Sequence, residues 1–363
     1  MLHRSRKDLS RRGRNGSPCP GSASGSCRRR ACPGIHYPID REGIILRIVA
    51  FEPLGIPDER LKAVAAPLIE AGHRVTQHHD RVEDLMDMIQ RGKEADVLIV
   101  VDQALPGKLL EACPNIRMIS IASEFHDQVD LQKARAKVVP VSVIPEYWTY
   151  SVAELTVTLL LAVMRRLTAC NELARGKQSE GCRDGRELFG KTVGIIGTGS
   201  VGLHVARILK AFGCELLGYS RTQKKEAEVW AGMEYVTIEE LLERSDIVTL
   251  HLPFNSETEG FLNREKLALM KQGAILINTA HGKLVDWHTL AELLKDGWLS
   301  GAGIDTLDVE PPVGRSHPLA KAPNVILTPG IGAATPEALE KRAELALANI
   351  ISWMDGKPKG VVA

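Results

Sequence analysis

The chain has 363 residues, of which 44% are hydrophobic and 25% are charged. This length predicts about two domains, and the composition is that of a soluble globular protein rather than a disordered or membrane chain. The formal net charge of +1 is unevenly spread, since residues 1–34 hold nine Lys or Arg and one acid. The remaining 37 basic and 44 acidic residues exclude a nucleic-acid footprint on the folded part.

The seven cysteines stand singly, and no pair has the spacing of metal ligands. We therefore expect no metal centre, and thiols that stay reduced in a cytoplasmic protein. The longest apolar run covers the ten residues 155–164, which is too short to span a bilayer. No membrane association is expected.

Residues 1–42 are expected to form a disordered basic extension, because they are rich in Arg, Ser, Gly and Pro and hold little apolar surface to bury. Three interpretations of this segment stay open. It is an extension without function or a misplaced start site, a targeting peptide, or a basic arm that binds an acidic partner.

From Gly43 onward, short β-branched runs alternate with amphipathic segments. Ile44–Phe51 predicts a strand and Asp58–Ala71 a helix. Further strands are predicted at 73–79, 96–101, 117–122 and 138–143, and helical segments at 82–90, 108–113 and 129–136. Such alternation predicts a doubly wound parallel sheet.

A long helix is predicted from Thr149 to Lys177, where apolar residues recur at helical spacing without proline. A second series of strands and helices then begins at Lys191. Its strands are predicted at 192–196, 215–219, 247–252, 274–278, 301–304 and 325–327, and a last helix at 336–354. The fold class is therefore α/β with two doubly wound parallel-sheet domains.

A glycine-rich motif follows the strand 193–196 and opens a helix. It consists of Gly197, Thr198, Gly199, Ser200, Val201 and Gly202. In this context the first glycine permits a tight turn, the second lets backbone N–H groups approach a pyrophosphate, and the third allows close packing of helix on strand. The motif predicts a dinucleotide-binding site.

The end of the next strand indicates which dinucleotide binds. An acid at this place bonds the ribose 2′-hydroxyl of NAD(H), whereas an arginine accommodates the 2′-phosphate of NADP(H). Here the strand ends in Ser220, Arg221 and Thr222 without a carboxylate. We predict a preference for NADP(H), with NAD(H) as the second option and a solvated basic loop as the alternative interpretation.

These motifs resemble the D-isomer-specific 2-hydroxyacid dehydrogenases from Ile44 to the C-terminus. The resemblance rests on the phosphate loop and on the segments 144–155, 250–263, 270–286, 303–312 and 324–338. It implies a flavodoxin-like substrate domain formed by residues 43–148 plus 335–363, with an inserted Rossmann domain of residues 149–334. It also implies a homodimer built with the long linking helix, and a small-molecule substrate.

The resemblance further implies cofactor contacts. Asp305 is similar to the residue that bonds the nicotinamide carboxamide, and Thr279 and Ala280 are similar to its neighbours. Leu252, Pro253 and Thr258 match the loop that passes beside the cofactor. Such contacts orient the reactive ring carbon rather than perform chemistry.

The family pattern of a catalytic Arg, Glu and His is kept only in part. Glu310 matches the Glu, but His281 stands in place of the Arg and Gly330 in place of the His. The segment expected to hold a substrate carboxylate reads Glu124, Phe125, His126, with Phe125 where the family has a glycine. These are the candidate substrate residues, together with Gly330.

All of these departures weaken binding and reduction of a simple 2-keto acid, which needs a bidentate donor and a proton donor. Two functions are consistent with them. One is an NAD(P)-dependent reductase for a carbonyl or imine of an atypical, neutral or cationic substrate, with His281 beside Glu310 as acid. The other is an inactive NADP(H)-binding sensor. A third interpretation, a conventional dehydrogenase rescued by another residue, stays open, although His317 is interpreted as a surface loop histidine.

Overall fold

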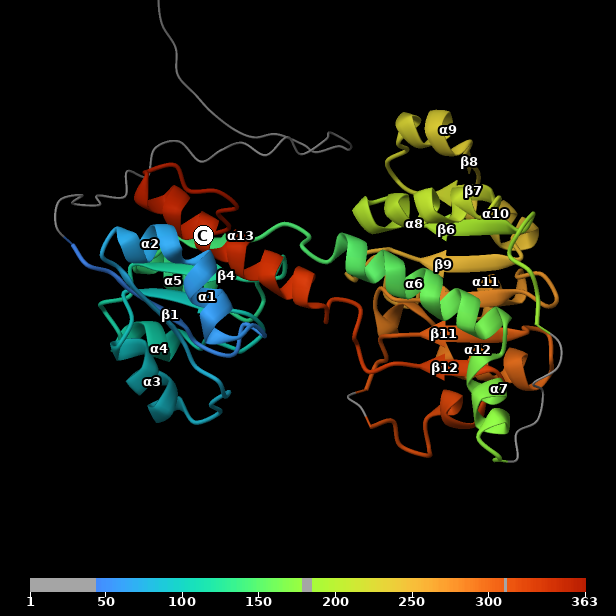
Figure 1. Cartoon of the computed structure of the whole chain (residues 1–363), viewed down its shortest axis with the longest axis horizontal. Helices are drawn as coiled ribbons and strands as arrows, with labels where there is room; N and C mark the ends of the chain where they lie inside the picture. Colours follow the sequence, from blue (N-terminus) through green and yellow to red (C-terminus); the bar gives the residue numbers. More distant parts are fainter. Residues whose placement is uncertain (1–43, 178–184, 310–311) are drawn as a thin grey trace, which may run out of the picture. The chain divides into compact units, whose positions relative to one another are not determined.

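The computed structural model describes residues 44–177, 185–309 and 312–363. The expectations for residues 1–42 lie outside these ranges. Within them, the chain forms two parallel sheets, each with helices packed on it (Figure 1). No helix in the described ranges is long and apolar enough to cross a membrane.

The first sheet has five parallel strands in the order β2-β1-β3-β4-β5. Its strands are β1 (Arg47–Ala50), β2 (Arg74–Gln77), β3 (Val97–Val100), β4 (Met118–Ile121) and β5 (Val141–Val143). Every residue of β3 and β4 is buried, because helices cover both faces of a parallel sheet.

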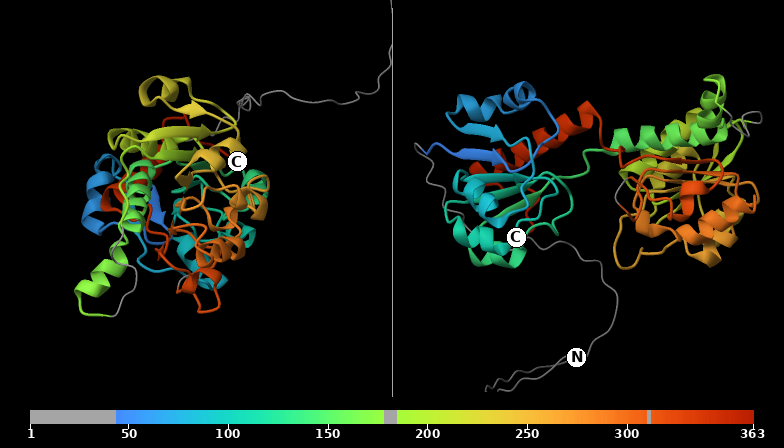
Figure 2. Two further views of the ribbon diagram at one scale, coloured as in Figure 1. Left: turned by 90° about the vertical axis from the view of Figure 1, so that its right-hand side faces the viewer. Right: turned by 90° about the horizontal axis from the view of Figure 1, so that it is seen from below.

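Alternate residues of these strands pack against different helices. One face carries α1 (Asp58–Val64), α2 (Ala66–Glu70) and α13 (Pro336–Met354), and the other carries α3 (Leu85–Lys93), α4 (Gly107–Ala112) and α5 (Leu131–Ala136). Helix α13 is the last helix of the chain, yet it lies along the first sheet (Figure 2). The final residues then pair with the edge strand, since the Val143 N–H donates to the Gly360 carbonyl at 2.9 Å, which covers the exposed edge.

The second sheet has seven parallel strands in the order β12-β11-β10-β9-β6-β7-β8. They are β6 (Thr192–Ile196), β7 (Glu215–Tyr219), β8 (Glu234–Tyr235), β9 (Ile247–Leu250), β10 (Ile275–Asn278), β11 (Gly301–Ile304) and β12 (Val325–Leu327). The chain reverses its winding between β6 and β9, and ligands of doubly wound folds bind at such a reversal, outside the carboxyl ends of the strands.

Helices also cover both faces of this sheet. One face carries α6 (Thr149–Met164), α8 (Ser200–Ala211) and α9 (Lys225–Ala231), and the other carries α10 (Ile238–Arg244), α11 (Arg264–Ala268) and α12 (Trp287–Lys295). Two short 3-10 helices, η1 (Gly282–Leu284) and η2 (Pro318–Lys321), lie in the loops after β10 and β11. The predicted fold class, two doubly wound α/β units, is confirmed.

Two predicted helices are wrong in extent. The segment 58–71 breaks at Ala65 into α1 and α2, because Pro67 lacks the N–H that would continue the hydrogen-bond ladder of α1. The segment 149–177 breaks into α6 and α7 (Leu167–Ala174) at Arg166, which has a left-handed φ of 49°. Helix α9 and the two-residue strand β8 were not predicted.

Candidate active site

The glycines of the phosphate loop differ in what surrounds them. A Cβ added to Gly197, whose φ is +97°, would lie 2.5 Å from the His251 carbonyl oxygen, and one added to Gly202 would lie 2.0 Å from the Gly197 oxygen. A Cβ on Gly199 would meet nothing within 4 Å. Gly197 and Gly202 therefore allow close packing of the backbone. Gly199 instead leaves open space at the start of α8, where Ser200 and Val201 form the first turn.

This loop fits the pyrophosphate of a dinucleotide. The first turn of α8 has free backbone N–H groups that point outward, and the helix dipole favours an anion there. The open space beside Gly199 admits such a group. A bound nicotinamide dinucleotide would supply or accept the hydride, and the residues of this chain would place it.

A tyrosine that sequence reasoning missed links this loop to the next one. The Tyr235 hydroxyl in β8 donates to Oγ1 of the buried Thr198 at 3.0 Å, and it accepts from the Lys224 N–H at 3.0 Å. The phosphate loop and the loop after β7 are thus held at a fixed separation. A two-residue strand gives no periodic signal that would have revealed this.

The loop after β7 carries Ser220, Arg221 and Thr222, as predicted. Arg221 is exposed, and its Nη1 lies 2.8 Å from Oε2 of Glu257, which is exposed as well. Exposed ion pairs of this kind contribute about 1 kcal/mol or less, so the guanidinium stays available to a ligand.

The loop after β9 is closed by its own side chains. Oγ1 of Thr258 donates to the Pro253 carbonyl at 2.7 Å, and the Thr258 N–H donates to Oδ1 of Asn255 at 3.1 Å. Leu252 is partly buried against the core of the second sheet. The predicted contact residues of this segment therefore lie at the carboxyl end of β9, beside the phosphate loop.

His281 lies just after β10, in a turn that a buried asparagine holds. Nδ2 of Asn278 donates to the His281 carbonyl at 2.9 Å, and Oδ1 accepts from the Ala280 N–H at 3.0 Å. Asn278 has no exposed surface, so these bonds fix the backbone that presents His281. The strand prediction placed Asn278 at the end of β10 but gave no hint of this role.

The His281 ring has a defined tautomer and neighbour. Its Nδ1 accepts from the Lys283 N–H at 3.2 Å, which leaves the proton on Nε2. The ring stacks on Phe254 with centroids 4.2 Å apart and 10° between the planes. Burial, with the charge of Lys283, lowers the pKa of His281 below its ordinary value, so the neutral imidazole prevails at pH 7.

Asp305 follows β11 and binds the chain's own loop. Its Oδ1 accepts from the Thr328 hydroxyl at 2.6 Å and the Ile331 N–H at 2.8 Å, and its Oδ2 accepts from the Gly332 N–H at 2.8 Å. Asp305 is 2% exposed. These bonds hold the loop of Gly330, whose φ is +73° and beside which a Cβ would meet nothing within 4 Å.

The remaining predicted contacts lie close to this loop or to β10. Thr279 is buried, and its Oγ1 lies 2.7 Å from Oγ1 of Thr156 in α6, while Ala280 is partly buried. The backbone after Asp305 passes so close to η1 that a Cβ on Gly282 would lie 2.2 Å from the Leu307 carbonyl carbon. Glu310 lies outside the described residues.

The interpretation of His317 as a surface histidine is wrong. Its side chain is 7% exposed, and its Nε2 lies 3.3 Å from Oδ1 of Asp308. Its Nδ1 accepts from the Leu319 N–H at 3.3 Å. Both ring nitrogens therefore interact with groups of the loop itself. The loop folds back over Trp287, so that the ring centroids of Trp287 and His317 lie 6.3 Å apart. His317 orders this loop.

The candidate substrate residues of the first unit follow β4. Burial, with the nearby charge of Glu146, raises the pKa of Glu124. Phe125 is 52% exposed and stacks on Trp148 with centroids 6.4 Å apart, and Tyr147 meets the same Trp148 edge-on at 4.7 Å. His126 is exposed. Carboxylates and aromatic faces are thus combined in this region.

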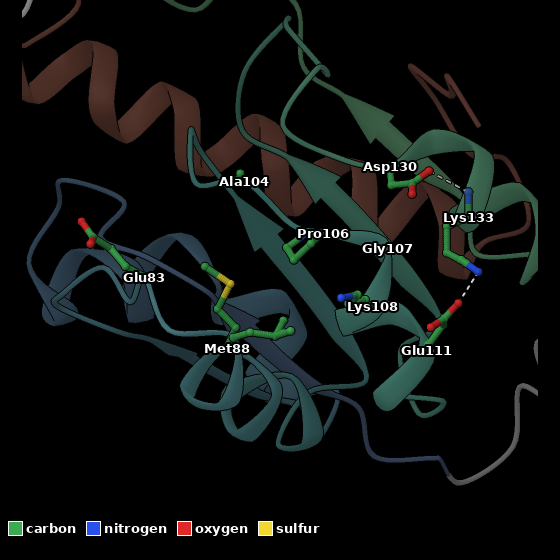
Figure 3. A pocket seen from close by; sticks show the side chains of 10 residues that line it. Glu83, Met88, Ala104, Pro106, Gly107, Lys108, Glu111, Asp130 and Lys133 are labelled. Carbon is green, nitrogen blue, oxygen red and sulfur yellow. Dashed lines mark hydrogen bonds and ion pairs between the residues drawn. The ribbon is translucent and has the colours of Figure 1, made fainter.

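An open recess of about 730 Å³ lies elsewhere on the first unit, between Met88 of α3 and Lys108 of α4 (Figure 3). Lys133 pairs there with Glu111, and none of the predicted site residues lines the recess. Among the described residues, no group of three His, Cys, Asp or Glu side chains is arranged to hold a metal ion.

Comparison with known proteins places these features in a context. Residues 157–332 match the model of the D-isomer specific 2-hydroxyacid dehydrogenase NAD binding domain. A glyoxylate reductase of Thermococcus litoralis is 39% identical over 279 residues, which cover 74% of this chain and 84% of the relative. One of Thermofilum pendens is 38% identical over 281 residues, covering 76% and 82%.

Among solved structures, an acyclic imino acid reductase in complex with NADPH and D-Arg is similar to this chain. It superposes with a TM-score of 0.72 at 29% identity, over 88% of this chain and 100% of the other. A D-2-hydroxyisocaproate dehydrogenase shares the fold, with a TM-score of 0.77 at 24% identity over 87% and 99% of the two chains.

Proposed function

Because this chain belongs to the D-isomer-specific 2-hydroxyacid dehydrogenase family, we propose that it reduces a carbonyl or imine of a neutral or cationic substrate, with NADP(H) as the preferred cofactor. The chain is an NAD(P)-dependent oxidoreductase. The proposal concerns which cofactor and which substrate class it uses.

The loop after β7 supports the preference for NADP(H). Arg221 offers a charged fork, and Ser220 and Thr222 offer hydroxyls, where a carboxylate would repel a 2′-phosphate. A similar structure was solved with NADPH bound. NAD(H) stays the second cofactor.

The environment of His281 is the observation that carries the substrate proposal. Its Nδ1 is already bonded to the Lys283 N–H, so a single N–H remains where a 2-keto acid requires two parallel donors. Its lowered pKa makes the ring a poor proton donor at pH 7. Glu124, in the segment that the family resemblance assigns to the substrate, disfavours an anionic substrate in addition.

An iminium substrate does not need the missing acid. Reduction of a carbonyl requires a proton for the oxygen, whereas a protonated imine already carries its proton on nitrogen. A bound NADPH would supply the hydride for the iminium carbon, so that the C=N π pair would become the nitrogen lone pair and the products would be an amine and NADP⁺. We therefore favour a substrate with a C=N bond and a cationic side chain, and the similar reductase that holds NADPH and D-Arg supports this choice.

The test is NADPH oxidation by the full chain with two substrates. One is glyoxylate, and the other is a 2-oxo acid with a terminal guanidinium, supplied with methylamine to form the imine. We expect faster oxidation with the imine. Equal or faster oxidation with glyoxylate would contradict the proposal, and NADPH binding without turnover of either compound would favour the sensor function.

A pair of double variants tests the role of the two substituted positions. His281→Arg with Gly330→His restores the bidentate donor and the acid, and we expect glyoxylate reduction to rise about 100-fold, the lower end of what a positioned acid contributes. Asn and His both tolerate a left-handed backbone, which suits the φ of +73° at Gly330. His281→Arg with Gly330→Asn is therefore the matched control without a proton donor.

A further inference from the structure

The loop after β9 brings a carboxylate to the end of β7. Glu257 and Arg221 are 36 residues apart in sequence, yet Glu257 Oε2 lies 2.8 Å from Arg221 Nη1. The sheet order explains the approach, because β9 and β7 flank β6 on its two sides and their loops flank the phosphate loop. Nothing in the local sequence predicts this pair.

Both loops that carry the pair are anchored. The Glu257 N–H donates to Oδ1 of Asn255 at 2.9 Å, within the closed turn that Thr258 completes. On the other side, the Tyr235 hydroxyl ties the Lys224 N–H to the phosphate loop. The two backbones are therefore fixed, and the distance between the charges is set by side-chain rotation alone.

We infer that Glu257 determines the balance between NADPH and NADH by competing with the 2′-phosphate for the Arg221 guanidinium. This inference rests on the proposed cofactor site. The carboxylate that usually accepts from a ribose 2′-hydroxyl at the end of this strand is absent from residues 218–222, and Glu257 supplies one from the neighbouring loop.

The pair gives the site two arrangements. With NADPH, the guanidinium turns to the 2′-phosphate and Glu257 moves away from the added charge. With NADH, Glu257 accepts a hydrogen bond from the 2′-hydroxyl, and its pairing neutralises Arg221. The side chains are 77% and 73% exposed, so water and salt screen their attraction. Exchanging Glu257 for the 2′-phosphate as the partner of Arg221 therefore costs little free energy, and both cofactors can bind.

The expected effect of removing the carboxylate is modest and directional. Glu257→Gln frees Arg221 and removes a charge that repels the 2′-phosphate, so NADPH should bind more tightly by about fivefold, which corresponds to the upper range for an exposed ion pair. NADH loses an acceptor and should bind no more tightly than before. In high salt, the stronger NADPH preference of Glu257→Gln should decrease toward the wild-type value.

The experiment is equilibrium binding of four compounds to the full chain, which needs no substrate and no turnover. NADPH, NADH, 2′,5′-ADP and 5′-AMP are titrated into the wild type, Glu257→Gln, and the control Glu259→Gln, which removes the same charge from an exposed position two residues away. We expect tighter binding of NADPH and 2′,5′-ADP by Glu257→Gln alone. Equal changes in the two variants would overturn the inference, because any loss of local charge would then suffice.

Arg221→Ala separates this inference from the proposed function. If Arg221→Ala weakens NADPH and Glu257→Gln leaves the ratio of NADPH to NADH affinity unchanged, the cofactor proposal stands and the role of Glu257 is refuted. If Arg221→Ala leaves the ratio unchanged, the proposed NADP(H) preference fails, and the inference fails with it.

Discussion

Replacing Asp305 by asparagine tests how the loop of Gly330 is held. The carboxylate accepts three hydrogen bonds, and two of the donors are backbone N–H groups, at Ile331 and Gly332. An asparagine has one acceptor oxygen and one NH₂ group, which only donates. With its oxygen kept at the position of Oδ1, its NH₂ group faces the Gly332 N–H, and two donors then oppose each other without a partner.

The magnitude follows from these bonds. A buried hydrogen bond to a charged group contributes about 1.5–3 kcal/mol, and an unpaired buried donor adds a penalty of similar size. Asp305 is 2% exposed, so solvent does not compensate for the loss. We expect Asp305→Asn to lower the free energy of unfolding by about 3 kcal/mol.

The control is Asp286→Asn, a substitution of the same chemistry at the N-cap of α12. Oδ1 of Asp286 accepts from the His288 and Thr289 N–H groups, and its Oδ2 accepts from the Thr289 hydroxyl. An asparagine keeps both backbone bonds, and its NH₂ group can donate to the hydroxyl, which also accepts. We expect a loss below about 1 kcal/mol.

Urea unfolding of both variants at pH 7 measures the difference. A loss for Asp305→Asn that is no larger than that for Asp286→Asn would refute the reasoning, because it would mean that the bonds to the loop of Gly330 contribute little. NADPH binding, measured in the same samples below the transition, reports whether the loop also supports the cofactor site.

Three further predictions concern the phosphate loop and the residues that pack on it. Burial of the ring lowers the pKa of His251 to about 3, whereas the unfolded chain takes up this proton near pH 6.5. The free energy of unfolding should therefore fall between pH 7 and pH 5 by at most about 2 kcal/mol, an upper bound because the residue as a whole is partly exposed. Urea midpoints of His251→Gln should show a smaller fall. Gly202→Ala places a Cβ 2.0 Å from the Gly197 oxygen, so NADPH binding should be lost in a titration even where circular dichroism shows a folded chain. Tyr235→Phe removes the hydroxyl that ties Thr198 to the loop after β7 and should weaken 2′,5′-ADP more than 5′-AMP, whereas equal weakening would speak against this link.

Local patterns in the sequence predicted the framework of both sheets. The buried strand β3 is a continuous apolar run, β4 is interrupted only by Ser120, and the phosphate loop directly follows β6. Hydrophobic periodicity and the flanking glycines are therefore enough to find these elements. The break at Arg166 was not predictable in this way. A left-handed arginine has no local signature, since glycine and asparagine are the residues that usually adopt this backbone.

The chemistry of individual site residues depends on contacts that are distant in sequence. Motif matching singled out His281, but its lowered pKa results from burial and the charge of Lys283, and its tautomer results from the Lys283 N–H. Glu257 reaches Arg221 only through the order of the strands. His317 was misinterpreted for the same reason, because its burial depends on the path of a loop that returns to Asp308.

The substitutions in the reactive half of the site change its charge in one direction. In the proposed function, His281, neutral at pH 7, replaces the permanently charged arginine that the family resemblance implies, Gly330 replaces the implied imidazole, and Glu124 adds a carboxylate. A site that loses cationic groups and gains an anionic one favours a substrate that is correspondingly more positive. Such a substrate also lessens the need for a proton donor when its own positive charge is the proton of an iminium. Charge balance and proton supply, which are independent requirements of the reaction, therefore lead to the same substrate class.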